Sequence, residues 1–112
     1  MDSLTVLEGK KLDAVMFVQD YLQLQLESFL VTYLSFPHVI REDHTHVFGD
    51  AEYRNRICEF IGEVVSSVTY VADQTFSLDF SGKKIECSLS PDVRISPEIV
   101  TIRLENGDMI VF

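Results

Sequence analysis

The stretch GKKLDAVMFVQDYLQLQL, residues 9–26, returns in outline as GEVVSSVTYVADQTFSLDF, residues 62–80. Both stretches begin with the pattern G-x5-V-x2-V-x-D and continue with a run in which apolar and polar residues alternate. With one residue inserted in the second copy, the match extends over about 9–39 and 62–93, and both copies end in P-x-V. We interpret them as two copies of one structural unit within a single domain, residues 1–112.

Each copy has the pattern of a three-stranded antiparallel meander. In the first copy we expect strands at about 11–18, 21–27 and 29–35, of which the second alternates leucine with glutamine. Asp20 suits the first turn because its side chain can bond the backbone two residues on. In the second copy the expected strands begin at about 63 and 75, and SGKK forms the last turn. Each sheet would bury one face and leave the other in water.

Between the copies, GDAEYRNRICEFIG predicts the only strong helix, at about 51–61. Asp50 is a suitable N-cap, and Gly62 can take the left-handed conformation that ends a helix. Tyr53, Ile57 and Ile61 recur every four residues and would form the buried stripe.

The segment VTIRLENGDMIVF, residues 100–112, predicts a C-terminal hairpin. Asn-Gly is the signature of a two-residue type I′ turn, which would pair Leu104 with Met109 and Ile102 with Val111. The expected fold is α+β and predominantly antiparallel β. The duplicated meander would form a curved sheet or half-barrel with one helix, and a compact sandwich is the alternative.

The composition is that of an ordinary globular chain with a strongly acidic balance. Eighteen acidic residues stand against nine basic ones, which gives a net charge of −9. Nucleic acids and anionic membranes require the opposite sign of charge, so we expect neither as a partner. The start of the chain lacks the pattern of a signal peptide and no apolar run is long enough to span a membrane, which favours a cytoplasmic protein.

Few residues are candidates for catalysis or metal binding. Cys58 and Cys87 lie among apolar neighbours and are expected to be buried free thiols. His44 and His46 would share a face of a strand and are the weak candidates for a metal site, but a solvated loop is the simpler interpretation. We find no nucleophile with a positioned base and no phosphate-binding loop, and we predict a protein that is not an enzyme and needs no cofactor.

Acidic and hydroxyl side chains on the expected wet faces are the candidates for binding a partner. Asp79 and Glu86 would point outward together from neighbouring strands, with Ser77 and Ser88 beside them. The full set of candidates is Glu42, Asp43, Glu52, Glu59, Ser77, Asp79, Glu86 and Ser88. Leu30 and Leu34 fall on what should also be a wet face, which indicates cover by the helix or by a second chain.

On GKKLDAVMFVQD, GEVVSSVTYVAD and the acidic balance, the chain resembles the small acidic immunity proteins of bacterial toxin–immunity systems, including contact-dependent growth inhibition. The resemblance covers about a third of the chain, and such proteins share no catalytic motif. It implies a cytoplasmic protein that binds a cognate toxin domain, often a basic nuclease, and blocks its active site or substrate path. The alternatives are a β module with a small-ligand pocket and a metal-binding protein that uses His44 and His46.

Overall fold

The computed structural model describes residues 2–42, 44–90 and 99–112, and their strands form two five-stranded antiparallel sheets. The first sheet contains, in spatial order, β1 (Leu12–Val18), β2 (Tyr21–Leu26), β3 (Phe29–Tyr33), β9 (Val100–Arg103) and β10 (Met109–Val111). The second contains β5 (His44–His46), β4 (His38–Arg41), β8 (Lys83–Ser88), β7 (Thr75–Phe80) and β6 (Ser67–Val71). The helices are the 3-10 helix η1 (Asp2–Leu7) and the α-helix α1 (Tyr53–Cys58). The predicted class, mostly antiparallel β with a single α-helix and a C-terminal hairpin, is confirmed.

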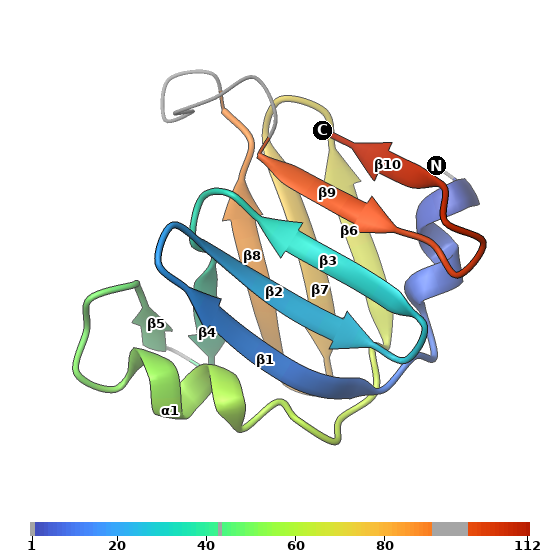
Figure 1. The fold of residues 1–112 in the computed structure, drawn as a ribbon. Coiled ribbons are helices and arrows are strands. Elements are labelled where there is room, and N and C mark those ends of the chain that lie inside the picture. Colours follow the sequence, from blue (N-terminus) through green and yellow to red (C-terminus); the bar gives the residue numbers. More distant parts are fainter. Residues whose placement is uncertain (1, 43, 91–98) are drawn as a thin grey trace.

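The two sheets lie face to face, and their strands run in clearly different directions (Figure 1). This arrangement is the sandwich that the sequence left as the alternative to one curved sheet. Its physical reason is that each meander has a single apolar face, so two sheets can bury those faces against each other. Helix α1 lies beside the sheets rather than inside a curved sheet (Figure 1).

The two repeated stretches lie in different sheets and touch where each begins. β1, β2 and β3 form one meander, and β6, β7 and β8 form the other. Gly9 N–H donates to Val65 O at 2.8 Å, and Gly62 N–H donates to Leu12 O at 2.7 Å. Leu12 and Val65 in turn donate to the residues that follow the two glycines, at 2.9 Å each. The four bonds thus follow the same pattern in both copies. The strand predicted from about residue 63 begins at Ser67.

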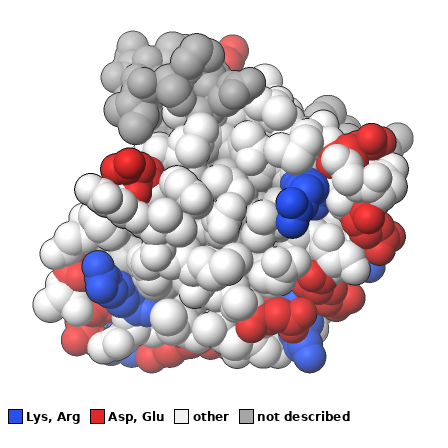
Figure 2. All heavy atoms as spheres, in the orientation of Figure 1, with Lys and Arg blue, Asp and Glu red and all other residues white. Residues whose placement is uncertain are grey.

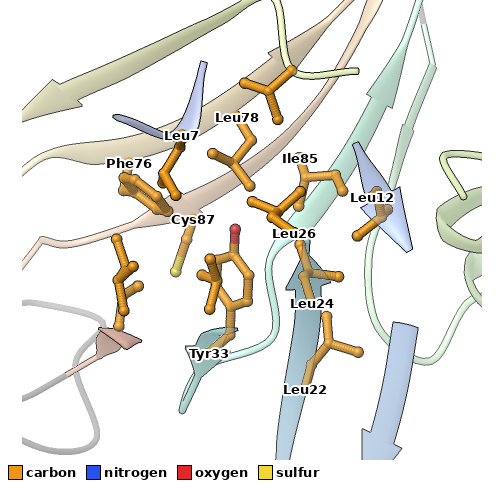
Figure 3. Packing of buried hydrophobic residues seen from close by; sticks show 14 of the residues in the cluster. Leu7, Leu12, Leu22, Leu24, Leu26, Tyr33, Phe76, Leu78, Ile85 and Cys87 are labelled. Carbon is orange, nitrogen blue, oxygen red and sulfur yellow. The ribbon is translucent and has the colours of Figure 1, made fainter. Parts of the chain in front are cut away.

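Leucine and aromatic side chains from both sheets fill the space between them (Figure 3). Leu22, Leu24 and Leu26 of β2 are fully buried, as the alternation predicts. The ring of Tyr33 from β3 lies 6.3 Å from that of Phe76 in β7 and links the two layers. The core therefore depends on both meanders at once.

Helix α1 is shorter than the predicted helix over 51–61. The Asp50 carboxylate accepts the Val47 N–H at 3.0 Å and does not cap the helix, which begins at Tyr53. After the helix the hydrogen bonds span three residues, from Phe60 N–H to Ile57 O and from Ile61 N–H to Cys58 O, at 3.1 Å each. This tighter winding turns Phe60 into the core and leaves Ile61 45% exposed, so the predicted stripe is wrong at its last member.

The C-terminal hairpin has a different register from the predicted one. Met109 pairs with Arg103 and Val111 pairs with Thr101. The reason is a three-residue loop, in which Gly107 N–H donates to Leu104 O at 2.9 Å and Gly107 has a φ of 93°. This is a turn followed by a left-handed glycine, which adds one residue to the two-residue turn. The slip moves Met109 and Val111 to the face of the sheet opposite to that of Ile102.

Candidate protein-binding surface

The outer face of the first sheet has almost no charge. Strand pairing places twelve side chains on this face, all at least partly exposed, and only one of them is charged. They are Ala14, Met16, Val18, Tyr21, Gln23, Gln25, Leu30, Thr32, Thr101, Arg103, Met109 and Val111. We call these twelve residues the charge-poor face. Across the whole chain 24% of residues are charged, so the outer face of a five-stranded sheet with one charge is unusual.

Polar side chains within the charge-poor face bond to one another or to its own backbone. Gln23 Nε2 donates to Thr32 Oγ1 at 3.2 Å. Gln25 Nε2 donates to Glu27 O at 2.6 Å and to Phe29 O at 3.2 Å. Because these amide donors already have protein partners, less hydrogen bonding to water is lost when another surface covers them.

Carboxylates stand around the margin of the charge-poor face. Asp20, Glu105 and Asp108 lie in the turns that join its strands, and within the described part of the chain none of them forms an ion pair. Figure 2 shows a broad uncharged area with red groups mostly along its edges. At one margin the charge is mixed, because Lys11 lies 3.9 Å from Asp13. A centre depleted of charge with a charged rim is the usual anatomy of a protein–protein interface.

The outer face of the second sheet is different, since it carries charges that are locally satisfied. Asp79 Oδ1 accepts the Ser77 hydroxyl at 2.9 Å, and its Oδ2 accepts Ser67 and Thr69 at 3.0 and 3.1 Å. Ser77 is only 2% exposed. Asp79 is thus held by three hydroxyl groups of its own sheet.

Of the remaining predicted site residues, Glu86 pairs with Ser77 on the neighbouring strand and so shares this side of the second sheet with Asp79, whereas Glu52 and Glu59 lie beside α1. Glu86 lies 3.6 Å from Lys84 on the same strand, and the exposed Ser88 accepts the Ser90 N–H at 3.3 Å. Glu52 and Glu59 both pair with Arg56 beside α1, at 3.0 and 2.7 Å.

Glu59 also pairs with Arg41. Glu42 follows β4 in a left-handed conformation with a φ of 51° and shares a shallow hollow with Asp79 and Lys84. Asp43 lies outside the described residues. The candidate carboxylates therefore occupy two places, the second sheet and the surroundings of α1, and most have a basic or hydroxyl partner.

The two histidines share the short strand β5 rather than a loop. Their ring centroids are 6.3 Å apart. The hollow beside them is lined by Arg41 and Arg56 as well as Glu42. Among the described residues there is no group of three or more histidine, cysteine, aspartate or glutamate side chains that could hold a metal ion. Two arginines next to the pair are unfavourable neighbours for a cation.

The two cysteines have different environments. Cys87 is buried in the core, and burial raises the pKa of its thiol to about 12. Since the thiolate is the reactive form, Cys87 is chemically inert at neutral pH. Cys58 is exposed, contrary to the prediction, because it lies on the solvent side of α1 away from Tyr53 and Ile57.

Two buried tyrosines complete the ionisable groups of the core. Tyr53 Oη donates to Pro37 O at 2.6 Å, whereas Tyr33 Oη has no hydrogen-bond partner among the described residues. Burial raises the pKa of both phenols, with a smaller contribution from Cys87. They are structural groups in the space between the sheets.

The chain matches no protein-family model, no curated protein and no solved structure. None of the helices in the described part of the chain has the length and apolar character needed to cross a bilayer.

The charge-poor face was only partly visible in the sequence. Leu30 lies on the outer face of β3, as the sequence predicts, and α1 lies beside the sheets rather than over β3 (Figure 1). The predicted hairpin register places Met109 and Val111 on the opposite face and is wrong. A search for strands whose outward positions lack charge would have found β2 and β3.

Proposed function

We propose that this chain is a non-enzymatic cytoplasmic protein that binds a basic partner protein through the charge-poor face. Within that class we favour an immunity protein that neutralises a toxin domain by covering its active site or substrate path. The observation that carries the proposal is the charge-poor face, whose surrounding turns hold carboxylates that form no ion pair within the described residues.

The size of the charge-poor face and the net charge of the chain both support a protein as the binding partner. A stable interface takes roughly 800 Å² from each partner, and the molecule measures 36 by 32 Å across its two longer axes. A basic partner would be attracted by the net charge of −9 and would then bury uncharged surface at the centre. A second copy of this chain would bring two acidic rims together, which is unfavourable.

The test begins with co-expression of this chain and the protein encoded immediately upstream. Under the proposal the neighbour is toxic alone, tolerated in the presence of this chain, and purified with it as one complex. A harmless neighbour that does not bind would contradict the immunity function.

Two matched threonine substitutions then locate the interface. Thr101→Lys places a positive charge within the charge-poor face, between β3 and β10, and we expect it to weaken binding at least tenfold because the charge is buried against a basic surface. Thr45→Lys makes the same change on the exposed strand β5 of the second sheet and should leave affinity within about twofold. Isothermal titration calorimetry measures both, and loss of binding in Thr45→Lys alone would move the interface to the second sheet.

A further inference from the structure

The outer edge of β10 offers unpaired backbone groups. Phe112 and Val100 exchange both backbone hydrogen bonds, at 2.8 and 2.9 Å, and Leu104 N–H donates to Asp108 O at 2.8 Å. In an antiparallel pair, hydrogen-bonded and non-hydrogen-bonded positions alternate. Met109 and Val111 therefore direct their N–H and C=O groups away from β9, and within the described residues these groups have no partner.

Two of the other edge strands, β1 and β6, are partly covered. The ring of Phe17 in β1 lies 6.4 Å from that of Tyr53 in α1, and the Arg54 guanidinium stands over the Phe17 ring at 5.2 Å. On β6, the N–H of Val68 is bonded by the Glu8 carboxylate at 3.3 Å, beside η1.

The strand at the remaining edge of the second sheet, β5, is short and polar. It has three residues and carries exposed His44 and Thr45. In contrast, Met109 and Val111 on β10 are apolar and 53% and 44% exposed. Natural sheets usually protect an edge with cover, charge or proline, and an apolar unpaired edge is a template for another strand.

We infer that an extended segment of the partner pairs with β10 and continues the first sheet by one strand. This inference rests on the proposed function and specifies how the partner is bound. Alternate side chains of the segment would be apolar and extend the charge-poor face beside Met109 and Val111. A lysine or arginine of the segment would pair with Glu105 or Asp108 in the adjoining turn, neither of which has an ion pair in the described structure. Backbone bonds supply affinity in this mode, and alternating side chains supply specificity.

Amide hydrogen exchange tests the inference on the unmodified protein. In the free chain we expect the amides of Met109 and Val111 to exchange fast, while that of Ile110 is protected by its bond to β9. In the complex with the upstream-encoded protein, Met109 and Val111 should become at least tenfold slower. If these two amides are already protected in the free chain, the edge is covered and the inference is wrong.

Proline substitution tests the same edge through affinity. Val111→Pro removes an N–H that points away from β9, so the hairpin should persist while binding weakens at least tenfold. Val111→Thr keeps the N–H and the branched shape and should bind within about threefold of the original chain. Exchange in the complex of the unmodified chain decides the question even if Val111→Pro does not fold.

The outcomes separate this inference from the proposed function. A complex in which Met109 and Val111 still exchange fast would overturn strand addition and leave the proposed function standing. Failure of the upstream-encoded protein to bind at all would refute the proposed function, and the inference with it. Dimerisation of this chain alone through β10, detected by analytical ultracentrifugation with protected Met109 and Val111 amides, would replace the partner with a second copy.

Discussion

Tyr33 and Tyr53 are a matched pair of buried phenols that differ in one hydrogen bond. Burial of an unpaired hydroxyl costs about 1–3 kcal/mol, so Tyr33→Phe should raise the free energy of unfolding by about 1 kcal/mol. Tyr53→Phe removes the hydrogen bond to Pro37 O and should lower the free energy of unfolding by about the same amount. Urea unfolding of both variants measures the difference. A destabilised Tyr33→Phe variant would show that the hydroxyl has a partner in solution, such as a buried water molecule.

The buried thiol of Cys87 makes stability depend on alkaline pH. Its pKa is about 12 in the folded chain, against a reference value of 9.0. The unfolded chain therefore loses this proton first, and the stabilisation that is complete below pH 9 declines as pH rises toward 12. The slope reaches at most about 1.4 kcal/mol per pH unit for one group.

The comparison with Cys58 isolates this effect. Urea unfolding in the presence of a reductant should show that the free energy of unfolding declines between pH 7 and 10. The decline should be smaller in Cys87→Ala, whose thiol is removed from the core, and unchanged in Cys58→Ala, where the exposed thiol is removed. Above pH 10 the raised pKa values of Tyr33 and Tyr53 act in the same direction. A flat profile between pH 9 and 10 in the unmodified chain would contradict the buried position of the Cys87 thiol.

At the scale of elements, the hairpin between β9 and β10 depends on its turn. Gly107 has a φ of 93°, and a Cβ added there would meet no atom within 4 Å. A side chain at position 107 would therefore destabilise the fold only through the unfavourable left-handed backbone conformation. Gly107→Ala should destabilise the chain by about 1–2 kcal/mol, and Gly107→Asn by less because asparagine visits this region more readily. Thermal unfolding compares the two, and equal stability of both with the original chain would contradict the left-handed turn.

Most of the elements were predictable because their patterns are local. Leu22, Leu24 and Leu26 alternate with polar residues and specify which face of β2 is buried without any knowledge of the partner sheet. The hairpin register was misread because Asn-Gly fits both a two-residue turn and the last two residues of a three-residue loop. The bond from Gly107 to Leu104 selects the longer loop. The prediction that Ile61 is buried is wrong because Ile61 continues the four-residue spacing of Tyr53 and Ile57, whereas the chain after α1 winds more tightly than an α-helix.

The candidate surface was less predictable, since it is formed by strands that are distant in the sequence. Thr32 of β3 meets Thr101 of β9 only after the sheet has formed. The acidic balance favours Asp79 and Glu86 as candidates, but Asp79 accepts the Ser77 hydroxyl and Glu86 lies beside Lys84. The scarcity of charge on one face of five strands is a property that no single segment displays.

For the molecule as a whole, the excess of negative charge should determine how fast it associates with a basic partner. With a net charge of −9, association with a basic partner should be strongly accelerated by long-range attraction. Raising the salt concentration from about 50 to 500 mM should lower the association rate at least tenfold, because screening shortens the range of the field. The dissociation rate, set by apolar and backbone contacts, should change little. Stopped-flow measurement of both rates is the test, and a salt-independent association rate would remove the role assigned to the acidic rim.

The pairing of β3 with β9 also has a consequence for how the chain acquires its fold. Val31 pairs with Ile102, so the first sheet cannot be completed until the whole second meander has been made. Contacts of such large sequence separation slow folding, and a chain dominated by them folds in roughly milliseconds to seconds. During synthesis β3 remains an open, apolar edge while the ribosome adds β4 to β8, and it is then a site for aggregation. The C-terminal hairpin that we assign to partner binding therefore also completes the first sheet during folding, because β9 covers the open edge of β3.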